Sequence, residues 1–194
     1  MSPRQYRMSR RADSAEATRR RIVDACFALH LEKGVAGTTL RDIAVRADVG
    51  IGTLYHHFAT YEDVVGACGV HAMSLMKPPQ PDIFDGVDRP DERIRTLVRE
   101  LFDSYRRMPS FGPIRSERRQ FAVLERAFTH EERTRRALIA AALRGARARA
   151  RLRALAFSLL DFNVYESLRA CGVDHDAAVE EISSVLLRRR RSRK

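Results

Sequence analysis

The chain has 194 residues, 44% of them hydrophobic, and a formal net charge of +11. This length provides one or two small domains with a core, and the charge favours an acidic partner, nucleic acid before a membrane surface, with solubility alone as the alternative. The longest apolar stretch, residues 155–160, is too short to span a membrane, and the basic N-terminus lacks the apolar region of a signal peptide. Three scattered cysteines argue against a disulfide framework or a zinc site and favour a reducing, cytoplasmic setting.

The N-terminal region predicts an arm followed by a helix. Residues 1–14 are polar and arginine-rich without periodicity, which indicates a flexible basic arm. A helix is expected from about Ser14 to Lys33, because apolar residues recur on one face and Gly34 can end it. The residues of that face are Ile22, Cys26 and Leu29.

Two short helices and a longer one should come next. Thr39 with Asp42 resembles a capping box at the start of a helix that ends near Ala47. A tight turn at residues 48–50 precedes about two helical turns at residues 51–58, and Thr60 caps a further helix that extends to about Met76.

The rest of the chain also predicts helices, separated by proline- and glycine-containing breaks at residues 77–91 and 108–113. The expected helices are Glu92–Arg107, Ile114–Thr129, Glu131–Arg149, Arg151–Ala170 and Asp174–Arg188, before a basic tail at residues 188–194. No segment has the pattern of a strand, so the fold class is all-α.

The segment RIVDACFALHLEKGVAGTTLRDIAVRADVGIGTLYHHFATYEDVV, from Arg21 to Val65, resembles the TetR family of bacterial transcription regulators. The resemblance implies a helix-turn-helix DNA-binding domain at residues 15–65 and a helical effector-binding and dimerisation domain at residues 66–187. A helix, a tight turn and a short second helix are independently the parts of a helix-turn-helix.

The N-terminus of the helix at residues 51–58 is then expected to meet base edges in the major groove. Gly50 and Gly52 allow close approach, Thr53 can bond to a base or phosphate, and Ile51 can pack on a thymine methyl group. Leu54 and Phe58, four residues apart, should face the core. The resemblance places the Tyr55 hydroxyl at a phosphate, His56 at a base-reading position and His57 at a backbone-contacting one; ordinary surface positions are the alternative for both histidines.

Phosphate anchors are expected from Thr39, at a helix N-terminus that favours anions, and from Arg41 and Arg46. A solvated helix face is the alternative for Arg41. The arm, with Arg4, Arg7, Arg10 and Arg11, could enter the minor groove or remain a disordered tail.

Four residues depart from the family pattern, which usually has Gly at Asp48, Ser at Gly50, Phe at His30 and Lys at Tyr61. The family lysine contacts phosphate, so Tyr61 is expected to keep a donor there without the charge. His30 is expected to be a boundary histidine with a satisfied partner.

The second domain should dimerise and, by the resemblance, sense a ligand. Apolar stripes on the last two predicted helices are expected to form a four-helix dimer interface, with packing inside one chain as the alternative. Their residues are Leu155, Leu159, Phe162, Leu168, Ile182, Val185 and Leu186. Candidate liners of a ligand pocket are Phe102, Tyr105, Phe111, Phe121, Phe128 and Tyr165, each of which could equally be core.

The sequence therefore predicts a dimeric DNA-binding repressor that a small apolar or amphipathic effector releases from a palindromic operator. An activator and an effector-independent, nucleoid-type protein are the alternatives. Catalytic residues, a metal site and a cofactor site are not expected, since no nucleophile–base pair, ligand cluster or phosphate loop has the required spacing.

Overall fold

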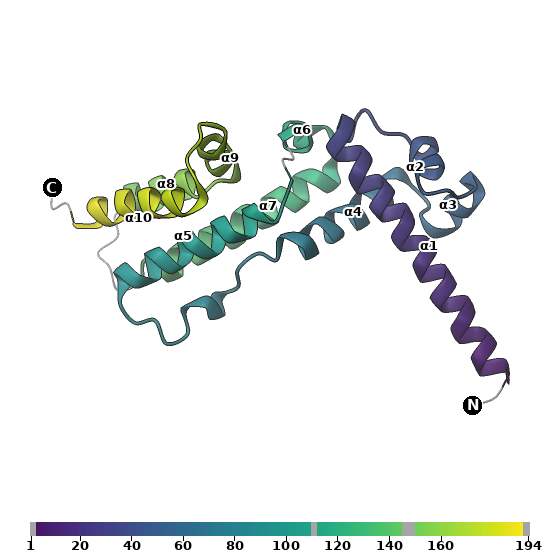
Figure 1. The fold of residues 1–194 in the computed structure, drawn as a ribbon, viewed down its shortest axis with the longest axis horizontal. Helices are drawn as coiled ribbons and strands as arrows, with labels where there is room; N and C mark the ends of the chain where they lie inside the picture. The colour runs from purple at the N-terminus through teal and green to yellow at the C-terminus, as the bar shows by residue number, and fades with distance from the viewer. Residues whose placement is uncertain (1–2, 110–111, 145–149, 192–194) are drawn as a thin grey trace. The chain divides into compact units, whose positions relative to one another are not determined.

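The computed structural model describes residues 3–109, 112–144 and 150–191, and every regular element within these ranges is helical (Figure 1). The prediction of an all-α fold is confirmed. The chain forms two compact units: unit 1 contains residues 1–74 and 111–127, and unit 2 contains residues 75–110 and 128–194. None of the described helices combines the length and apolar character needed to cross a membrane.

Unit 1 is built around a long N-terminal helix. Helix α1 packs on α2 and α6, and α2 packs on α3. The elements are α1 (Pro3–Lys33), α2 (Leu40–Arg46), α3 (Ile51–His57), α4 (Tyr61–Met76), α6 (Gly112–Ser116), the 3-10 helix η2 (Arg118–Gln120) and the first residues of α7 (Ala122–Ala142).

Local chemistry explains where these helices begin and end. Gly34 follows α1 with φ +79°, a left-handed conformation that glycine adopts at little cost. Thr39 begins α2 with a complete capping box, because its hydroxyl accepts from the Asp42 N–H while the Asp42 carboxylate accepts from the Thr39 N–H.

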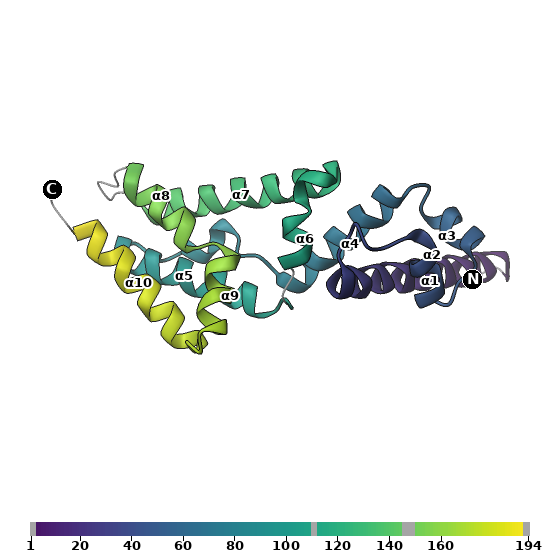
Figure 2. The ribbon, with the colours of Figure 1, turned by 90° about the horizontal axis from the view of Figure 1, so that it is seen from above.

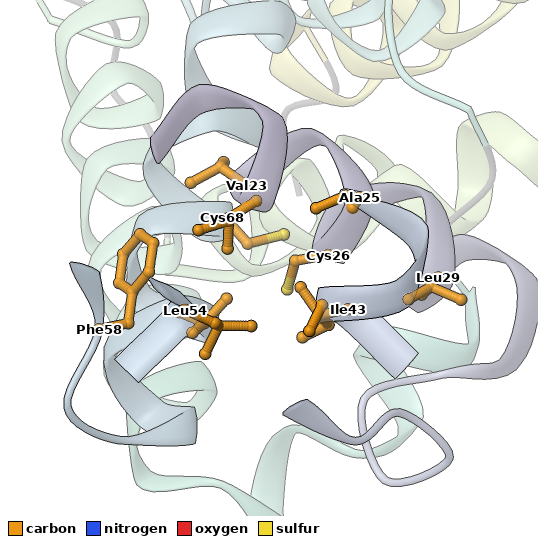
Figure 3. Packing of buried hydrophobic residues seen from close by; sticks show 12 residues of the cluster. Val23, Ala25, Cys26, Leu29, Ile43, Leu54, Phe58 and Cys68 are labelled. Atoms are coloured by element: carbon orange, nitrogen blue, oxygen red, sulfur yellow. The ribbon is translucent and has the colours of Figure 1, made fainter. Parts of the chain in front are cut away.

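A single apolar core holds α1–α4 together (Figure 3). Its most deeply buried members come from all four helices, so the core fixes α3 against the other three. They are Ile22, Cys26, Ile43, Leu54 and Val64, each 0% exposed.

Within unit 2, α10 packs on α5, α8 and α9 (Figure 2). It contains the 3-10 helix η1 (Pro81–Phe84), α5 (Pro90–Arg106), the remainder of α7, α8 (Ala150–Leu159), α9 (Phe162–Ala170) and α10 (His175–Arg191). Gly172, at φ +83°, follows the end of α9 as predicted.

Three predicted boundaries are wrong. Helix α1 begins at Pro3, so the arm is helical over residues 3–14 instead of irregular; the side chains of Arg4, Arg7, Arg10 and Arg11 lie outside the described residues. Helix α7 continues through Glu131, where a break was expected, and residues 112–120 form two short helical segments before it. Unit 1 also gains residues 111–127, which were expected in the second domain.

The predicted helix Arg151–Ala170 is divided because polar groups gather at its middle. The Asp161 carboxylate caps α9 by accepting from the Asn163 N–H. Arg135, 2% exposed, donates to the Leu160 carbonyl and to Asp161, and the Tyr105 hydroxyl donates to the same carbonyl. Because the helix is interrupted here, the Leu160 carbonyl is free to accept these two hydrogen bonds from buried side chains.

Candidate nucleic-acid interface

The turn between α2 and α3 is short and tightly hydrogen-bonded. The Val49 N–H donates to the Ala44 carbonyl at 3.0 Å, and the Asp48 N–H donates to the Val45 carbonyl at 3.2 Å. Asp48 has φ +51°, a left-handed conformation that explains why glycine suits this position better. Gly50 is the N-cap of α3 and supplies no side-chain cap, as the departure from serine predicts.

Helix α3 is buried on one side and open on the other. Leu54 and Phe58 are 0% and 3% exposed, so their predicted core positions are confirmed. The opposite side carries residues that were expected to contact DNA, with His57 half-buried beside them. Its exposed residues are Ile51, Gly52, Thr53, Tyr55 and His56, with Ile51 at 45% and Tyr55 at 53% exposure.

The hydroxyl of Thr39, a predicted phosphate anchor, already has two partners. It donates to the Asp42 carboxylate at 2.8 Å and accepts from the Asp42 N–H. Lys33 also contacts this carboxylate, and the Lys33 and Thr39 hydrogen bonds lower the pKa of Asp42 to about 2. The carboxylate is thus ionised beside the N-terminus of α2, where it competes with a phosphate for the same positive end of the helix. Arg41, one residue before it, is exposed.

Arg46, another predicted anchor, pairs with an acidic residue of α1. Its two terminal nitrogens each lie 2.8 Å from one carboxylate oxygen of Glu32, a fork-to-fork arrangement that fixes the guanidinium. Glu32 therefore has a lowered pKa, mainly because of this hydrogen bond. The geometry does not fit the prediction that the Arg46 charge is open to a phosphate.

The Tyr61 hydroxyl is turned into unit 1, contrary to the prediction that it replaces a phosphate-binding lysine. It donates to the Val35 carbonyl at 2.6 Å and lies 3.0 Å from His30 Nε2. Burial raises the pKa of Tyr61. His30, 2% exposed, thus has the satisfied partner that was expected, although it is more deeply buried than a boundary residue.

Sequence reasoning missed Glu117, which holds the loop between α1 and α2. One oxygen of its carboxylate accepts from the Val35 N–H at 2.6 Å and from the Ala36 N–H at 3.2 Å. Val35 and Glu117 are 82 positions apart in the chain. No local pattern marks such a pairing, so only the fold reveals it.

The residues proposed to line a ligand pocket belong to two different units, and their role in ligand binding stays a prediction. Phe102, Tyr105 and Tyr165 pack together in unit 2, with ring centroids 4.9–6.1 Å apart, and are at most 5% exposed. Phe121 instead lies in unit 1 beside Tyr61, Phe128 is half-buried, and Phe111 lies outside the described residues. Phe102, Tyr105 and Tyr165 are therefore core residues of unit 2.

A small cavity of about 10 Å³ does occur in unit 2, and its lining is entirely apolar. Helices α5, α7, α8 and α10 contribute to it. None of the proposed aromatic liners borders it; the lining residues are Ile94, Leu97, Ile139, Ala142, Leu143, Leu152, Ala156, Leu160 and Leu186. This volume is far below the roughly 300–1,000 Å³ of ligand pockets.

The predicted dimer stripes are partly used within one chain. Phe162, Ile182 and Leu186 are buried in unit 2, where Phe162 meets the Tyr105 ring edge-on at 5.4 Å between centroids. Their apolar surface is covered within the chain, which fits the alternative of packing inside one chain, and their place in a dimer interface stays a prediction. The half-buried members are Leu155, Leu159, Leu168 and Val185.

Comparison with known proteins adds sequence evidence for the N-terminal helices. Residues 22–68 match the family model described as "Bacterial regulatory proteins, tetR family". The chain is 32% identical over 97 residues to the HTH-type transcriptional repressor KstR2 of Mycobacterium tuberculosis (strain CDC 1551 / Oshkosh), a match that covers 50% of this chain and 48% of that protein. The chain thus spans about half the length of the curated relatives it matches.

Solved structures share the fold over a larger part of the chain. AibR, in complex with isovaleryl coenzyme A and operator DNA, superposes with a TM-score of 0.63 at 18% identity and covers 87% of this chain and 97% of its own. A TetR-like transcriptional regulator from Rhodococcus sp. RHA1 gives a TM-score of 0.63 at 16% identity, covering 88% and 94%. At these identities the likeness establishes the fold alone.

Proposed function

We propose that the chain is a member of the tetR family of bacterial regulatory proteins, whose model matches residues 22–68, and that it is a dimeric, sequence-specific repressor that a small molecule releases from its operator. The curated relative KstR2 is described as an HTH-type transcriptional repressor, which supports repression over activation.

The observation that carries the proposal is the exposed first turn of α3. Gly50 and Gly52 leave the main chain accessible there, while Thr53 and Tyr55 present hydroxyl groups to solvent. The apolar core fixes this turn through Leu54, so its side chains are held ready for the major groove before DNA arrives. The net charge of +11 adds long-range attraction to DNA.

Dimerisation is part of the proposal because helix-turn-helix proteins read paired half-sites about 34–36 Å apart. The residues we assign to the interface are the four members of the predicted apolar stripes that are half-buried in α8, α9 and α10. They are Leu155, Leu159, Leu168 and Val185.

Release by a ligand is supported by the AibR structure, whose description includes both a coenzyme A thioester and operator DNA. Unit 2 holds a small apolar cavity bordered by α5, α7, α8 and α10, and we infer that a ligand favours a conformation in which these helices separate around it. Such a ligand lowers DNA affinity by the difference between its binding free energies for the two conformations.

The proposal is tested by fluorescence anisotropy with DNA that flanks the protein's own gene and with an unrelated duplex of equal length. Specific repression predicts tighter binding to the flanking DNA and a steep salt dependence from released counterions. Equal binding to both duplexes would favour the nucleoid-type alternative, and no binding to either at low salt would contradict the DNA-binding function.

A further inference from the structure

Two thiols and an imidazole meet in the core of unit 1. Cys26 and His30 lie four residues apart on one face of α1. Cys68 comes from α4, and Figure 3 shows the two cysteines. Their exposures are 0%, 2% and 5%. The ligating atoms of all three residues lie within 4.8 Å of one another, and no other such trio of potential metal ligands occurs among the described residues.

The hydrogen bonds of Tyr61 determine which ring nitrogen of His30 carries the proton. A carbonyl oxygen can only accept, so the Tyr61 hydroxyl gives its hydrogen to the Val35 carbonyl. The Tyr61 oxygen then accepts from His30 Nε2, 3.0 Å away. His30 Nδ1 is therefore the unprotonated nitrogen, with its lone pair available as a ligand.

This lone pair lies near both thiols. Nδ1 lies 3.6 Å from the sulfur of Cys68 and 3.8 Å from the sulfur of Cys26, which is nearer to Nε2, at 3.4 Å. A metal ion about 2.0 Å from a nitrogen and about 2.3 Å from a sulfur holds the two ligand atoms roughly 3.5–3.7 Å apart. Cys68 thus already has the separation from Nδ1 that a shared ion requires, and the Cys26 thiol reaches it by a small shift towards Nδ1.

We propose that Cys26, Cys68 and His30 Nδ1 bind one Cu(I) ion in a buried, three-coordinate site. Thiolate ligands select soft ions, and Cu(I) accepts three ligands without a fourth. Zn(II) normally takes four, and the trio supplies three. Binding releases the two thiol protons to solvent and leaves the oxidation state of the ion unchanged.

Tyr61 is a positioning residue in this site. Metal-binding histidines usually donate their second N–H to an oxygen that orients the ring, and the Tyr61 oxygen has that place here. The proposal is independent of the DNA-binding function, because it concerns only metal binding inside unit 1.

The test uses the reduced full-length protein without oxygen, titrated with Cu(I) against a chromogenic Cu(I) chelator. We expect one ion per chain, an ultraviolet thiolate-to-copper absorption, and a higher melting temperature, since an ion that binds only the folded state stabilises it. Zn(II) binding without Cu(I) binding would overturn the choice of ion.

Variants separate this site from adventitious thiol binding. His30→Phe introduces the residue that the family usually has, so it should fold, and it is expected to lower Cu(I) affinity by at least about tenfold, as should Cys68→Ser. Tyr61→Phe should weaken binding about tenfold while both thiols remain. Cys171→Ser, at an exposed cysteine of unit 2, is the matched control and should change nothing. Unchanged affinity in both His30→Phe and Cys68→Ser would overturn the proposal.

Discussion

The guanidinium of Arg46 and the carboxylate of Glu32 form two parallel hydrogen bonds, each 2.8 Å long, between α2 and α1. A basic residue on α2 that was expected to anchor a phosphate therefore has an acidic partner in its own unit. Arg41, on the same short helix, is the exposed cation whose phosphate role remains a prediction.

Arg41→Gln should reduce the salt dependence of operator binding more than Arg46→Gln. Each lost phosphate contact lowers the slope of log K against log salt by about 0.9. We expect that reduction for Arg41→Gln and almost none for Arg46→Gln, measured by anisotropy over a salt series. Equal reductions in both variants would mean that the Glu32 pair opens when DNA binds.

Asp48→Gly should stabilise the protein. The φ of +51° at Asp48 is unfavourable for a residue with a Cβ atom, and glycine relieves about 1 kcal/mol of this cost. Chemical unfolding followed by circular dichroism would measure the gain. Asp48→Ala is the control: it keeps the Cβ atom without the polar side chain that tolerates this conformation, so it should be no more stable than the natural chain.

Glu117→Ala should destabilise unit 1, mainly because the N–H of the buried residue Val35 loses its acceptor, along with the exposed N–H of Ala36. An unsatisfied group of this kind costs about 1–3 kcal/mol. Glu117→Gln keeps one acceptor oxygen, and both bonds converge on one oxygen, so this variant should retain most of the stability. Equal losses of stability in Glu117→Ala and Glu117→Gln would mean that the negative charge of Glu117, and not its hydrogen bonds, stabilises unit 1.

Asp42 should make stability depend on pH in the acidic range. Its pKa is about 2 in the folded protein, below the ordinary value of 3.8, so the folded state binds this proton less readily than the unfolded state. The stabilisation is complete above about pH 4 and disappears as the pH falls towards 2.

Asp42→Asn isolates this effect from other acidic groups. The stability difference between the natural chain and the variant should shrink steadily between pH 4 and pH 2, as measured by urea unfolding at each pH. A difference that stays constant over this interval would contradict the assigned cause.

Much of unit 1 was predictable because its signals are local. Gly34 ends α1, and Thr39 and Asp42 cap α2. Leu54 and Phe58, four residues apart among exposed neighbours, mark the inner face of α3. Each of these depends on residues a few positions apart.

The errors came from partners distant in the chain. The inward hydroxyl of Tyr61 depends on the Val35 carbonyl, and the break after α8 depends on Arg135 and Tyr105 meeting at Leu160. Phe162 belongs to a stripe in sequence but is covered by Tyr105 in the fold. Hydrophobic periodicity identifies the apolar face of a helix, but it does not identify the helix or partner chain that packs against that face.

The most direct test of the central claim is the ratio of affinities for the DNA flanking the gene and for an unrelated duplex, measured in a Thr53→Ala/His56→Ala variant. Both side chains lie on the exposed side of α3 and neither is buried, so the variant should fold. If α3 reads bases, this ratio should collapse towards one while the salt dependence stays nearly unchanged. An unchanged ratio would show that sequence is read elsewhere and would contradict the account.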